Sequence, residues 1–179
     1  MLQQRKMLNE NQFSELNNKI LAFFIQLDLA EIKSIHIFLP IIKNNEPNTF
    51  LIINWLTENR PDIQIIVSRS DFAAHSMSNH PFLGLEDLAV NRYGIPEPQT
   101  EKIFTRKPDM VLVPLLAFDK RGYRVGYGKG FYDRFLSDKQ SKKVGISIFD
   151  SIVRIDDIHK DDIRLDCCIT PNGIIKFER

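Results

Sequence analysis

The segment DMVLVP, residues 109–114, is a nearly continuous apolar run and limits the possible folds more than any other part of this sequence. A short run without polar alternation is typical of a β-strand that is buried on both faces. Such strands occur in parallel sheets whose two faces are covered by other layers. The segment KKVGISIF, residues 142–149, has the same character. Together the two segments predict a buried, mostly parallel sheet.

Predicted helices alternate with predicted strands in the N-terminal part of the chain. Apolar residues from Asn11 onward recur at spacings of three and four, which indicates an amphipathic helix that buries Phe13, Leu16, Ile20, Phe23, Phe24 and Leu27. Residues 34–40, SIHIFLP, predict a strand. Residues 49–59 predict a helix with Thr49 as its N-cap, and residues 63–67 predict another strand. This alternation favours βαβ units.

The rest of the chain continues the pattern after a long irregular stretch. Residues 68–107 are rich in Pro, Asn, Ser and Gly, so we expect short irregular strands, a helical turn near residues 85–91 and a binding loop. Two strands joined by the turn at residues 171–173, Pro-Asn-Gly, are expected near the end. We therefore predict a single α/β domain over residues 1–179, with a three-layer α/β/α architecture and a mostly parallel central sheet.

Composition and charge exclude several classes of protein. The formal net charge is +1 and the basic residues are spread along the chain, which argues against nucleic acid or a membrane surface as the main partner. The longest apolar runs are far shorter than a membrane span, and the N-terminal segment lacks the apolar core of a secretory signal. The adjacent Cys167 and Cys168 should be reduced and point to opposite faces of a strand, and His36 should be a core or half-buried residue with its hydrogen bonds satisfied. We expect a cytoplasmic protein that is a monomer or a weak homo-oligomer.

One bend contains half of the glycines. The chain has 8 glycines, and four of them lie within residues 122–130: Gly122, Gly126, Gly128 and Gly130. Glycine permits positive φ and lets the backbone approach a ligand closely. The bend is expected beyond the carboxyl ends of the strands, where its amides and Lys129 can form an anion site. Asp133, one turn into the next helix, is placed to hold Mg²⁺ beside bound phosphates.

The bend matches neither of two common phosphate-binding motifs. A P-loop requires Ser or Thr after Gly-Lys, but Gly130 follows Lys129. A dinucleotide-binding fingerprint that begins at Gly126 requires glycine where this sequence has Phe131. A flexible turn with a solvated Lys129 is the alternative interpretation of the bend when it is taken alone.

With its flanks, the bend has a more specific match. Residues 113–136, VPLLAFDKRGYRVGYGKGFYDRFL, resemble the signature of the 5-formyltetrahydrofolate cyclo-ligases, also called 5,10-methenyltetrahydrofolate synthetases. Weaker matches follow the same order at residues 37–49, 93–98 and 161–166, so the resemblance covers nearly the whole chain. It implies an α/β/α enzyme that uses ATP and Mg²⁺ to close 5-formyltetrahydrofolate to 5,10-methenyltetrahydrofolate, with release of ADP and phosphate.

The resemblance also implies roles for individual residues. Lys129 and Arg124 would be catalytic. ATP would contact Arg5, Lys6, Arg124, Val125, Gly126, Tyr127, Gly128, Lys129, Gly130, Phe131 and Tyr132. The folate would contact Leu39, Glu46, Tyr127, Gly128, Lys129, Gly130 and Phe131, and Tyr93 is a further candidate for lining the pterin pocket. Asp133 and Asp162 would share the magnesium ion.

The N-terminus departs from the family pattern. The family usually opens with a basic Lys-x-x-x-Arg stretch that reaches ATP, whereas this sequence has only Arg5 and Lys6 before the first predicted helix. Either the start is truncated or other residues substitute. A non-catalytic protein that binds folate or a nucleotide on the same fold is therefore the alternative function. A sugar-phosphate isomerase or transferase is a third, although it would need neither ATP nor a metal-binding Asp133.

Overall fold

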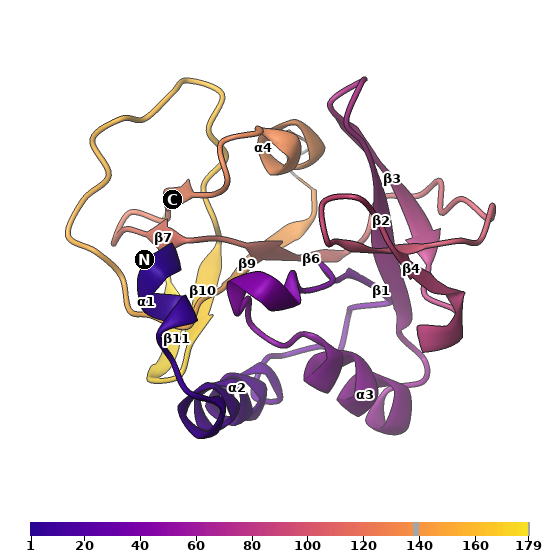
Figure 1. Ribbon diagram of the computed structural model, residues 1–179, viewed down its shortest axis with the longest axis horizontal. Coiled ribbons are helices and arrows are strands. Elements are labelled where there is room, and N and C mark those ends of the chain that lie inside the picture. The colour runs from indigo at the N-terminus through magenta and orange to yellow at the C-terminus, as the bar shows by residue number, and fades with distance from the viewer. Residues whose placement is uncertain (138–139, 179) are drawn as a thin grey trace.

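The computed structural model describes residues 1–137 and 140–178, and a seven-stranded sheet lies at its centre (Figure 1). The strand order is β11-β10-β9-β6-β1-β2-β3. The strands are β1 (Ser34–His36), β2 (Gln64–Asp71), β3 (Ser76–Pro81), β6 (Met110–Pro114), β9 (Lys142–Ile146), β10 (Cys167–Thr170) and β11 (Gly173–Lys176). The five inner strands pair in parallel, and β3 and β11 pair antiparallel at the two edges. The predicted mostly parallel sheet is confirmed.

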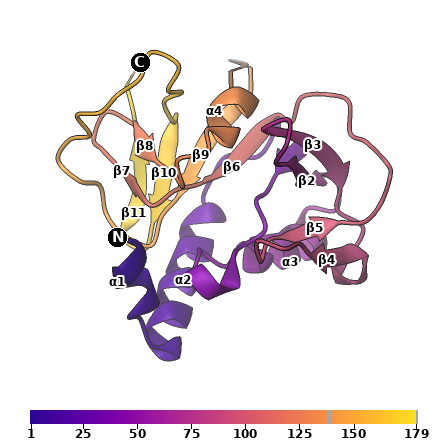
Figure 2. The same ribbon diagram turned by 45° about the horizontal axis from the view of Figure 1, so that its top comes forward.

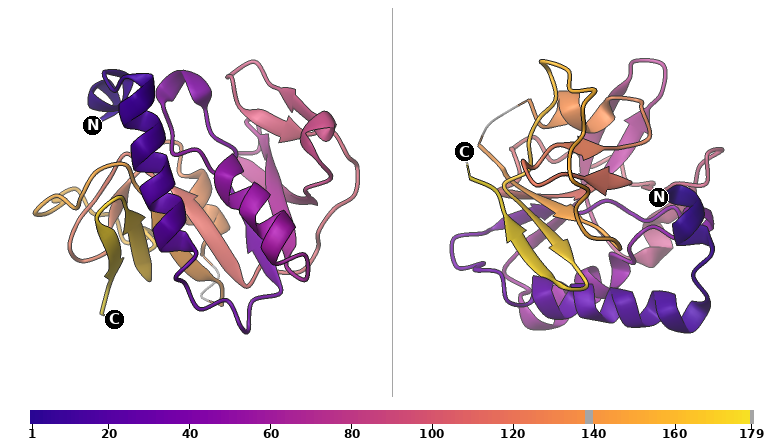
Figure 3. Two further views of the ribbon diagram at one scale, coloured as in Figure 1. Left: turned by 90° about the horizontal axis from the view of Figure 1, so that it is seen from below. Right: turned by 90° about the vertical axis from the view of Figure 1, so that its left-hand side faces the viewer.

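Helices and loops form a layer on each face of this sheet (Figures 1 and 3). α2 (Glu10–Phe24) and α3 (Phe50–Asn59) cover the lower face in Figure 1, and α1 (Leu2–Lys6) precedes them. The short α4 (Phe131–Phe135) and the irregular segment 147–166 cover the upper face. The predicted three-layer α/β/α fold is therefore confirmed, with one layer much thinner than the other. None of the helices in the described part of the chain is long and apolar enough to cross a membrane.

Two small hairpins and two 3₁₀ turns complete the fold (Figure 2). β4 (Leu88–Val90) pairs with β5 (Pro96–Pro98) beside β2 and near α3, and β7 (Ala117–Phe118) pairs with β8 (Arg124–Val125) near β9 and β10. The 3₁₀ turns are η1 (Ile42–Asn44) and η2 (Leu85–Asp87). The prediction for residues 68–107 was partly wrong, because β2 continues to Asp71 and forms a regular hairpin with the six-residue β3. This edge hairpin is polar and half exposed, so its residues lack the apolar pattern by which strands are predicted.

The sheet separates two apolar clusters. On β6, Met110 and Leu112 pack into the cluster between the sheet and α2 and α3, whereas Val111 and Val113 pack into the cluster between the sheet and α4. The two cysteines separate in the same way, because Cys167 lies in the first cluster and Cys168 in the second, and both are free thiols. Alternate side chains of a strand point to opposite faces, so both faces of these inner strands must be apolar.

Thr49 precedes α3 as predicted, but its side chain makes no capping hydrogen bond to the helix. Its hydroxyl instead donates to the carbonyl of Phe38 at 2.6 Å, and the residue is fully buried. Thr49 therefore ties the start of α3 to the chain that leaves β1. Asn9 is a true N-cap, because it forms a capping box with Gln12 at the start of α2.

Candidate active site

The glycine loop, residues 126–130, lies beyond the carboxyl end of β6, after the β7–β8 hairpin, and leads directly into α4. Gly128 and Gly130 have φ of 75° and 64°, which other residues rarely adopt. A Cβ built at Gly126 or Gly128 meets no other atom within 4 Å, so internal packing does not require glycine at either position. Residues 125–129 are exposed. The open space beside Gly126 and Gly128 fits a backbone that approaches a ligand closely.

An ion pair closes the base of this loop. Arg124 Nη2 lies 2.7 Å from Asp133 Oδ1, and the Arg124 side chain is only 5% exposed. Arg124 Nη1 also donates to the carbonyl of Ile163, and the amide of Ile163 donates to Asp133 Oδ1 at 3.3 Å. The pair thus joins β8, α4 and the segment 147–166. Arg124, predicted to contact the phosphates, has its guanidinium held inside the protein.

Arg134 fixes the far side of the same loop. Its Nη2 donates to the carbonyl of Lys129 and its Nε to the carbonyl of His75, each at 2.8 Å. These bonds join the glycine loop to the turn between β2 and β3. The side chain of Lys129 is exposed, so its ammonium group is free to meet an anion. The role of Arg134 was not predicted, because no local pattern shows that residues 75 and 129 meet.

Glu46 lies between β1 and α3, as the sequence indicated, and it interacts with Tyr127 of the glycine loop. It is 4% exposed, and its Oε2 accepts a hydrogen bond from the amide of Ile41 at 2.7 Å. Burial raises the pKa of Glu46, while the Ile41 amide, a hydrogen bond with Tyr127 and the charge of Arg5 lower it. Leu39, the other residue predicted on this side, is buried in the core at 6% exposure.

An aromatic cluster lies on the other side of the glycine loop and is formed by Phe72, His75, Tyr93 and Phe131. The ring centroids of Phe72 and Tyr93 are 4.0 Å apart, and those of Phe72 and Phe131 are 5.3 Å apart. The guanidinium of Arg92 lies 4.9 Å from the centroid of Tyr93. Tyr93 was predicted here, whereas Phe72 and His75 were given no role. Both residues lie in the segment 68–107, which was expected to include a binding loop.

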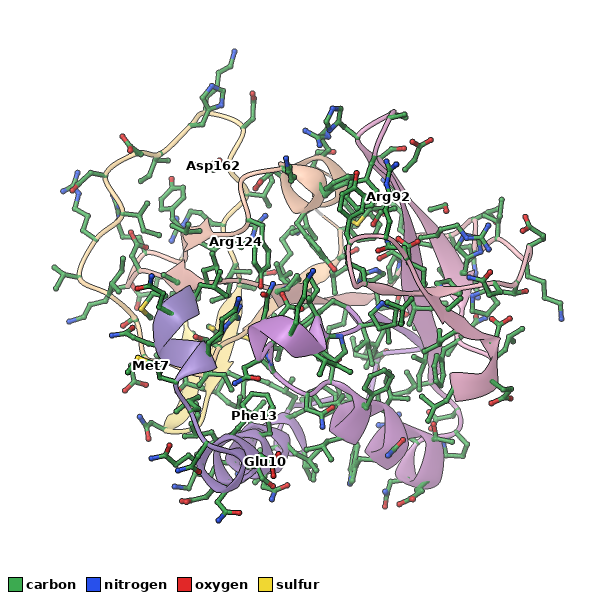
Figure 4. All side chains as sticks on the ribbon, in the orientation of Figure 1. Met7, Glu10, Phe13, Arg92, Arg124 and Asp162 are labelled. Atoms are coloured by element: carbon green, nitrogen blue, oxygen red, sulfur yellow. The ribbon has the colours of Figure 1, made fainter. Side chains whose placement is uncertain are left out.

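The two predicted metal ligands lie on the α4 side of the sheet (Figure 4). Figure 4 shows Asp162 above the sheet, together with Arg124, the ion-pair partner of Asp133. Glu10 and Phe13 are on α2, below the sheet. Asp162 Oδ2 accepts a hydrogen bond from the amide of His159 at 2.8 Å. Within residues 1–137 and 140–178, no group of three or more His, Cys, Asp or Glu side chains is placed to hold a metal ion.

The two N-terminal cations lie in different environments. Lys6 is exposed, but Arg5 is 2% exposed. Arg5 Nη2 donates to the hydroxyl of Tyr127 at 2.7 Å, and Nη1 donates to the carbonyl of Leu115 at 3.3 Å. Arg5 therefore contacts the glycine loop through the Tyr127 hydroxyl.

Asp119 organises the β7–β8 hairpin, a role that was not predicted. It is fully buried, and its carboxylate accepts hydrogen bonds from the amides of Arg121, Tyr123 and Ile155 and from the Arg121 guanidinium. Burial alone raises the pKa of Asp119, but these hydrogen bonds lower it below its usual value. The hairpin that carries Arg124 is therefore held by a buried carboxylate.

The sequence is similar to a known protein family and to several of its members. A family model described as the 5-formyltetrahydrofolate cyclo-ligase family matches residues 1–171. The 5-formyltetrahydrofolate cyclo-ligase of Mycoplasma genitalium is 31% identical over 82% of this chain and 79% of that protein. A probable 5-formyltetrahydrofolate cyclo-ligase of Schizosaccharomyces pombe is 36% identical over 51% of this chain, and this match spans only 53% of that relative.

Two solved structures share the fold. A 5,10-methenyltetrahydrofolate synthetase of Aquifex aeolicus superposes with a TM-score of 0.83 and 25% identity, over 99% of this chain and 89% of that chain. A 5,10-methenyltetrahydrofolate synthetase of Mycoplasma pneumoniae superposes with a TM-score of 0.70 and 25% identity, over 95% and 93% of the two chains. The family model, the sequence relatives and the shared fold lead to one conclusion: the chain belongs to the 5-formyltetrahydrofolate cyclo-ligase family.

Proposed function

We propose that this protein converts 5-formyltetrahydrofolate to 5,10-methenyltetrahydrofolate with consumption of ATP. One observation in the structure carries this proposal beyond family membership. Tyr127 belongs to the glycine loop, and its hydroxyl interacts with both Arg5 and the buried Glu46. The expected phosphate loop and the expected pterin acid are therefore separated by a single side chain. That proximity suits a reaction between a triphosphate and a reduced pterin.

The proposed reaction has two steps. The formyl oxygen on N5 attacks the γ-phosphorus of ATP, and ADP leaves with the electrons of the broken bond. N10 of the same folate then attacks the activated formyl carbon, inorganic phosphate leaves with the former formyl oxygen, and the N10 proton is lost to the departing phosphate or to water. Phosphoryl transfer depends mainly on positioning and on neutralisation of charge, so this chemistry does not require a protein nucleophile.

Four parts of the chain supply those functions. The amides of residues 126–130 and the ammonium of Lys129 would bind the phosphates, and the exposed Lys6 would add a further charge. Arg124 would hold the loop through Asp133. The aromatic cluster of Phe72, His75, Tyr93 and Phe131 would stack on the pterin, and Glu46 would accept its N–H groups.

The proposed magnesium ion would be held by Asp133 and Asp162 together with the phosphates. Both hydrogen bonds that Asp133 accepts within the described part of the chain end on Oδ1, so Oδ2 can serve as a ligand. Mg²⁺ commonly uses one or two carboxylates, substrate phosphates and several waters, so these two residues fit it without a complete protein cage. When bound, the ion would neutralise charge on the phosphates.

An absorbance assay tests this function. Protein mixed with 5-formyltetrahydrofolate, ATP and Mg²⁺ should produce the methenyl chromophore, and reactions that lack ATP should not. A flat absorbance trace with folded protein would contradict the proposal. If calorimetry then detected tight folate binding without turnover, the alternative of a non-catalytic binding protein would replace it.

A further inference from the structure

The most unusual side chain outside the expected nucleotide contacts is that of Arg5. A buried arginine is expected to have an ionic partner and to satisfy all of its donors. Arg5 is 2% exposed, yet it forms none of the direct ion pairs found within residues 1–137 and 140–178. Its Nε is buried and has no hydrogen-bond partner in that part of the chain. Such a costly arrangement calls for a functional reason.

Hydrogen bonds hold Arg5 at both its side chain and its backbone. Nη1 donates to the carbonyl of Leu115, just after β6, and Nη2 donates to the hydroxyl of Tyr127 at 2.7 Å. The Nδ2 group of Asn45, the residue before Glu46, donates to the backbone carbonyl of Arg5 at 2.9 Å. Arg5 is thus attached through its guanidinium to Leu115 and Tyr127, and through its backbone to the residue next to Glu46.

Tyr127 connects this arginine to the carboxylate. Its hydroxyl accepts from Arg5, which leaves its own proton available to Glu46. Hydrogen bonding with Tyr127 and the charge of Arg5 both lower the pKa of Glu46, against the effect of its burial. The same environment raises the pKa of Tyr127 to about 12, through burial first and then the charge of Glu46. Tyr127 therefore remains a neutral donor at ordinary pH.

We propose that Arg5 is a positioning residue for the folate side of the site, which acts through the Tyr127 hydroxyl on the Glu46 carboxylate, and is not a ligand of the nucleotide. The inference rests on the proposed function, because it assigns Glu46 to the pterin. It replaces the expectation that Arg5 contacts ATP. A guanidinium that donates to the Leu115 carbonyl and the Tyr127 hydroxyl, on a residue that is only 2% exposed, has no free face for a triphosphate.

The test separates folate binding from nucleotide use. The variants are Arg5→Met, Arg5→Lys, Tyr127→Phe and the double variant, and Arg154→Met is the control because Arg154 forms an exposed ion pair with Asp156. For each variant, calorimetry gives the Kd of 5-formyltetrahydrofolate without ATP, and kinetics give the KM of ATP at saturating folate. Circular dichroism confirms that each variant is folded.

Arg5→Met should raise the Kd of 5-formyltetrahydrofolate about tenfold, roughly the loss of one hydrogen bond to a charged group, and change the KM of ATP less than twofold. Arg5→Lys should recover part of the affinity because it restores the charge. Once Tyr127 is phenylalanine, the Arg5→Met change should have a much smaller effect, because residues that act as a unit are not additive.

Three results would overturn the inference. A raised KM of ATP with an unchanged folate Kd would make Arg5 a nucleotide ligand. Fully additive effects would show that Arg5 does not act through Tyr127. If Arg5→Met fails to fold, Tyr127→Phe removes a single hydroxyl at a partly exposed residue, and an unchanged folate Kd in that variant overturns the inference by itself. If the wild-type protein makes no methenyl product, the proposed function fails instead.

Discussion

Arg124 and Asp133 form an ion pair across the base of the glycine loop, with Nη2 2.7 Å from Oδ1. The pair holds the end of β8 and the start of α4 together, while residues 125–129 between them remain exposed. The loop is thus fixed at its base and open at its tip. This combination suits a phosphate site, because the amides are held in place while the space beside Gly126 and Gly128 is open.

Replacing Asp133 with asparagine should raise the Mg²⁺ concentration needed for half-maximal activity. The change removes a carboxylate proposed to hold the ion and weakens the pair with Arg124. A magnesium titration of the methenyl-forming activity measures this effect. The exposed Asp157→Asn serves as the control. A titration curve identical to that of the wild type would exclude Asp133 as a ligand.

Removing the ammonium group of Lys129 should slow turnover with little effect on stability. Lys129→Ala should lower kcat/KM for ATP by about 10²–10³-fold, the range found when one charge-stabilising donor is lost. Because the Lys129 side chain is exposed, the melting temperature of the variant should stay close to that of the wild type. Lys120→Ala, at an exposed lysine of the β7–β8 hairpin, is the matched control. Normal turnover by Lys129→Ala would refute its assignment to the phosphates.

His36 should make the protein sensitive to mild acid. It is fully buried, neither ring nitrogen has a partner among the described residues, and burial lowers its pKa from 6.5 to about 3. The unfolded chain therefore binds a proton below pH 6.5 that the folded protein does not. The contribution of His36 to the free energy of unfolding is fully present above that pH. It falls by about 1.4 kcal/mol per pH unit as the pH drops toward the pKa of His36 in the folded protein.

Urea unfolding of the wild type and His36→Leu between pH 7 and pH 4 checks this prediction. The difference between the two proteins should shrink or reverse as the pH falls, because only the wild type carries the depressed histidine. His159→Leu, at a side chain that is 70% exposed, should follow the wild type. Parallel curves for the wild type and His36→Leu would show that His36 does not titrate on unfolding.

Asp119→Asn should destabilise the fold by about 1–3 kcal/mol, because it weakens a buried hydrogen-bond network and removes the charged partner of Arg121, whose own side chain is 37% exposed. Chemical denaturation measures the loss, and Asp156→Asn, at an 85% exposed carboxylate, is the control. An equal, small loss in both variants would show that the β7–β8 hairpin does not depend on Asp119.

The fold was largely predictable because its inner strands are apolar on both faces. Residues 109–114 and 142–149 contain the two central strands β6 and β9, and the helical spacing from Asn11 onward corresponds to α2. Prediction failed where tertiary contacts outweigh local pattern. Thr49 binds Phe38 and not its own helix, and the β2–β3 hairpin is regular although its sequence is polar.

The candidate site was predicted where it depends on local sequence and missed where it depends on long-range contacts. The concentration of glycines indicated the loop, and the family resemblance singled out Glu46. The bond of Arg134 to residue 75, and that of Arg5 to Tyr127, join residues too far apart in the sequence for a local pattern to predict. The resemblance implied that Arg5 contacts ATP, whereas α1 packs beside η1 and Arg5 is only 2% exposed.

The central claim is that the formyl oxygen of the folate is transferred to the γ-phosphate of ATP within this site. The most direct measurement uses 5-formyltetrahydrofolate that carries a heavy oxygen isotope in its formyl group and follows the label by mass spectrometry. The account predicts that methenyl product and ADP form together and that the inorganic phosphate carries the label. Methenyl product accompanied by unlabelled phosphate would contradict it.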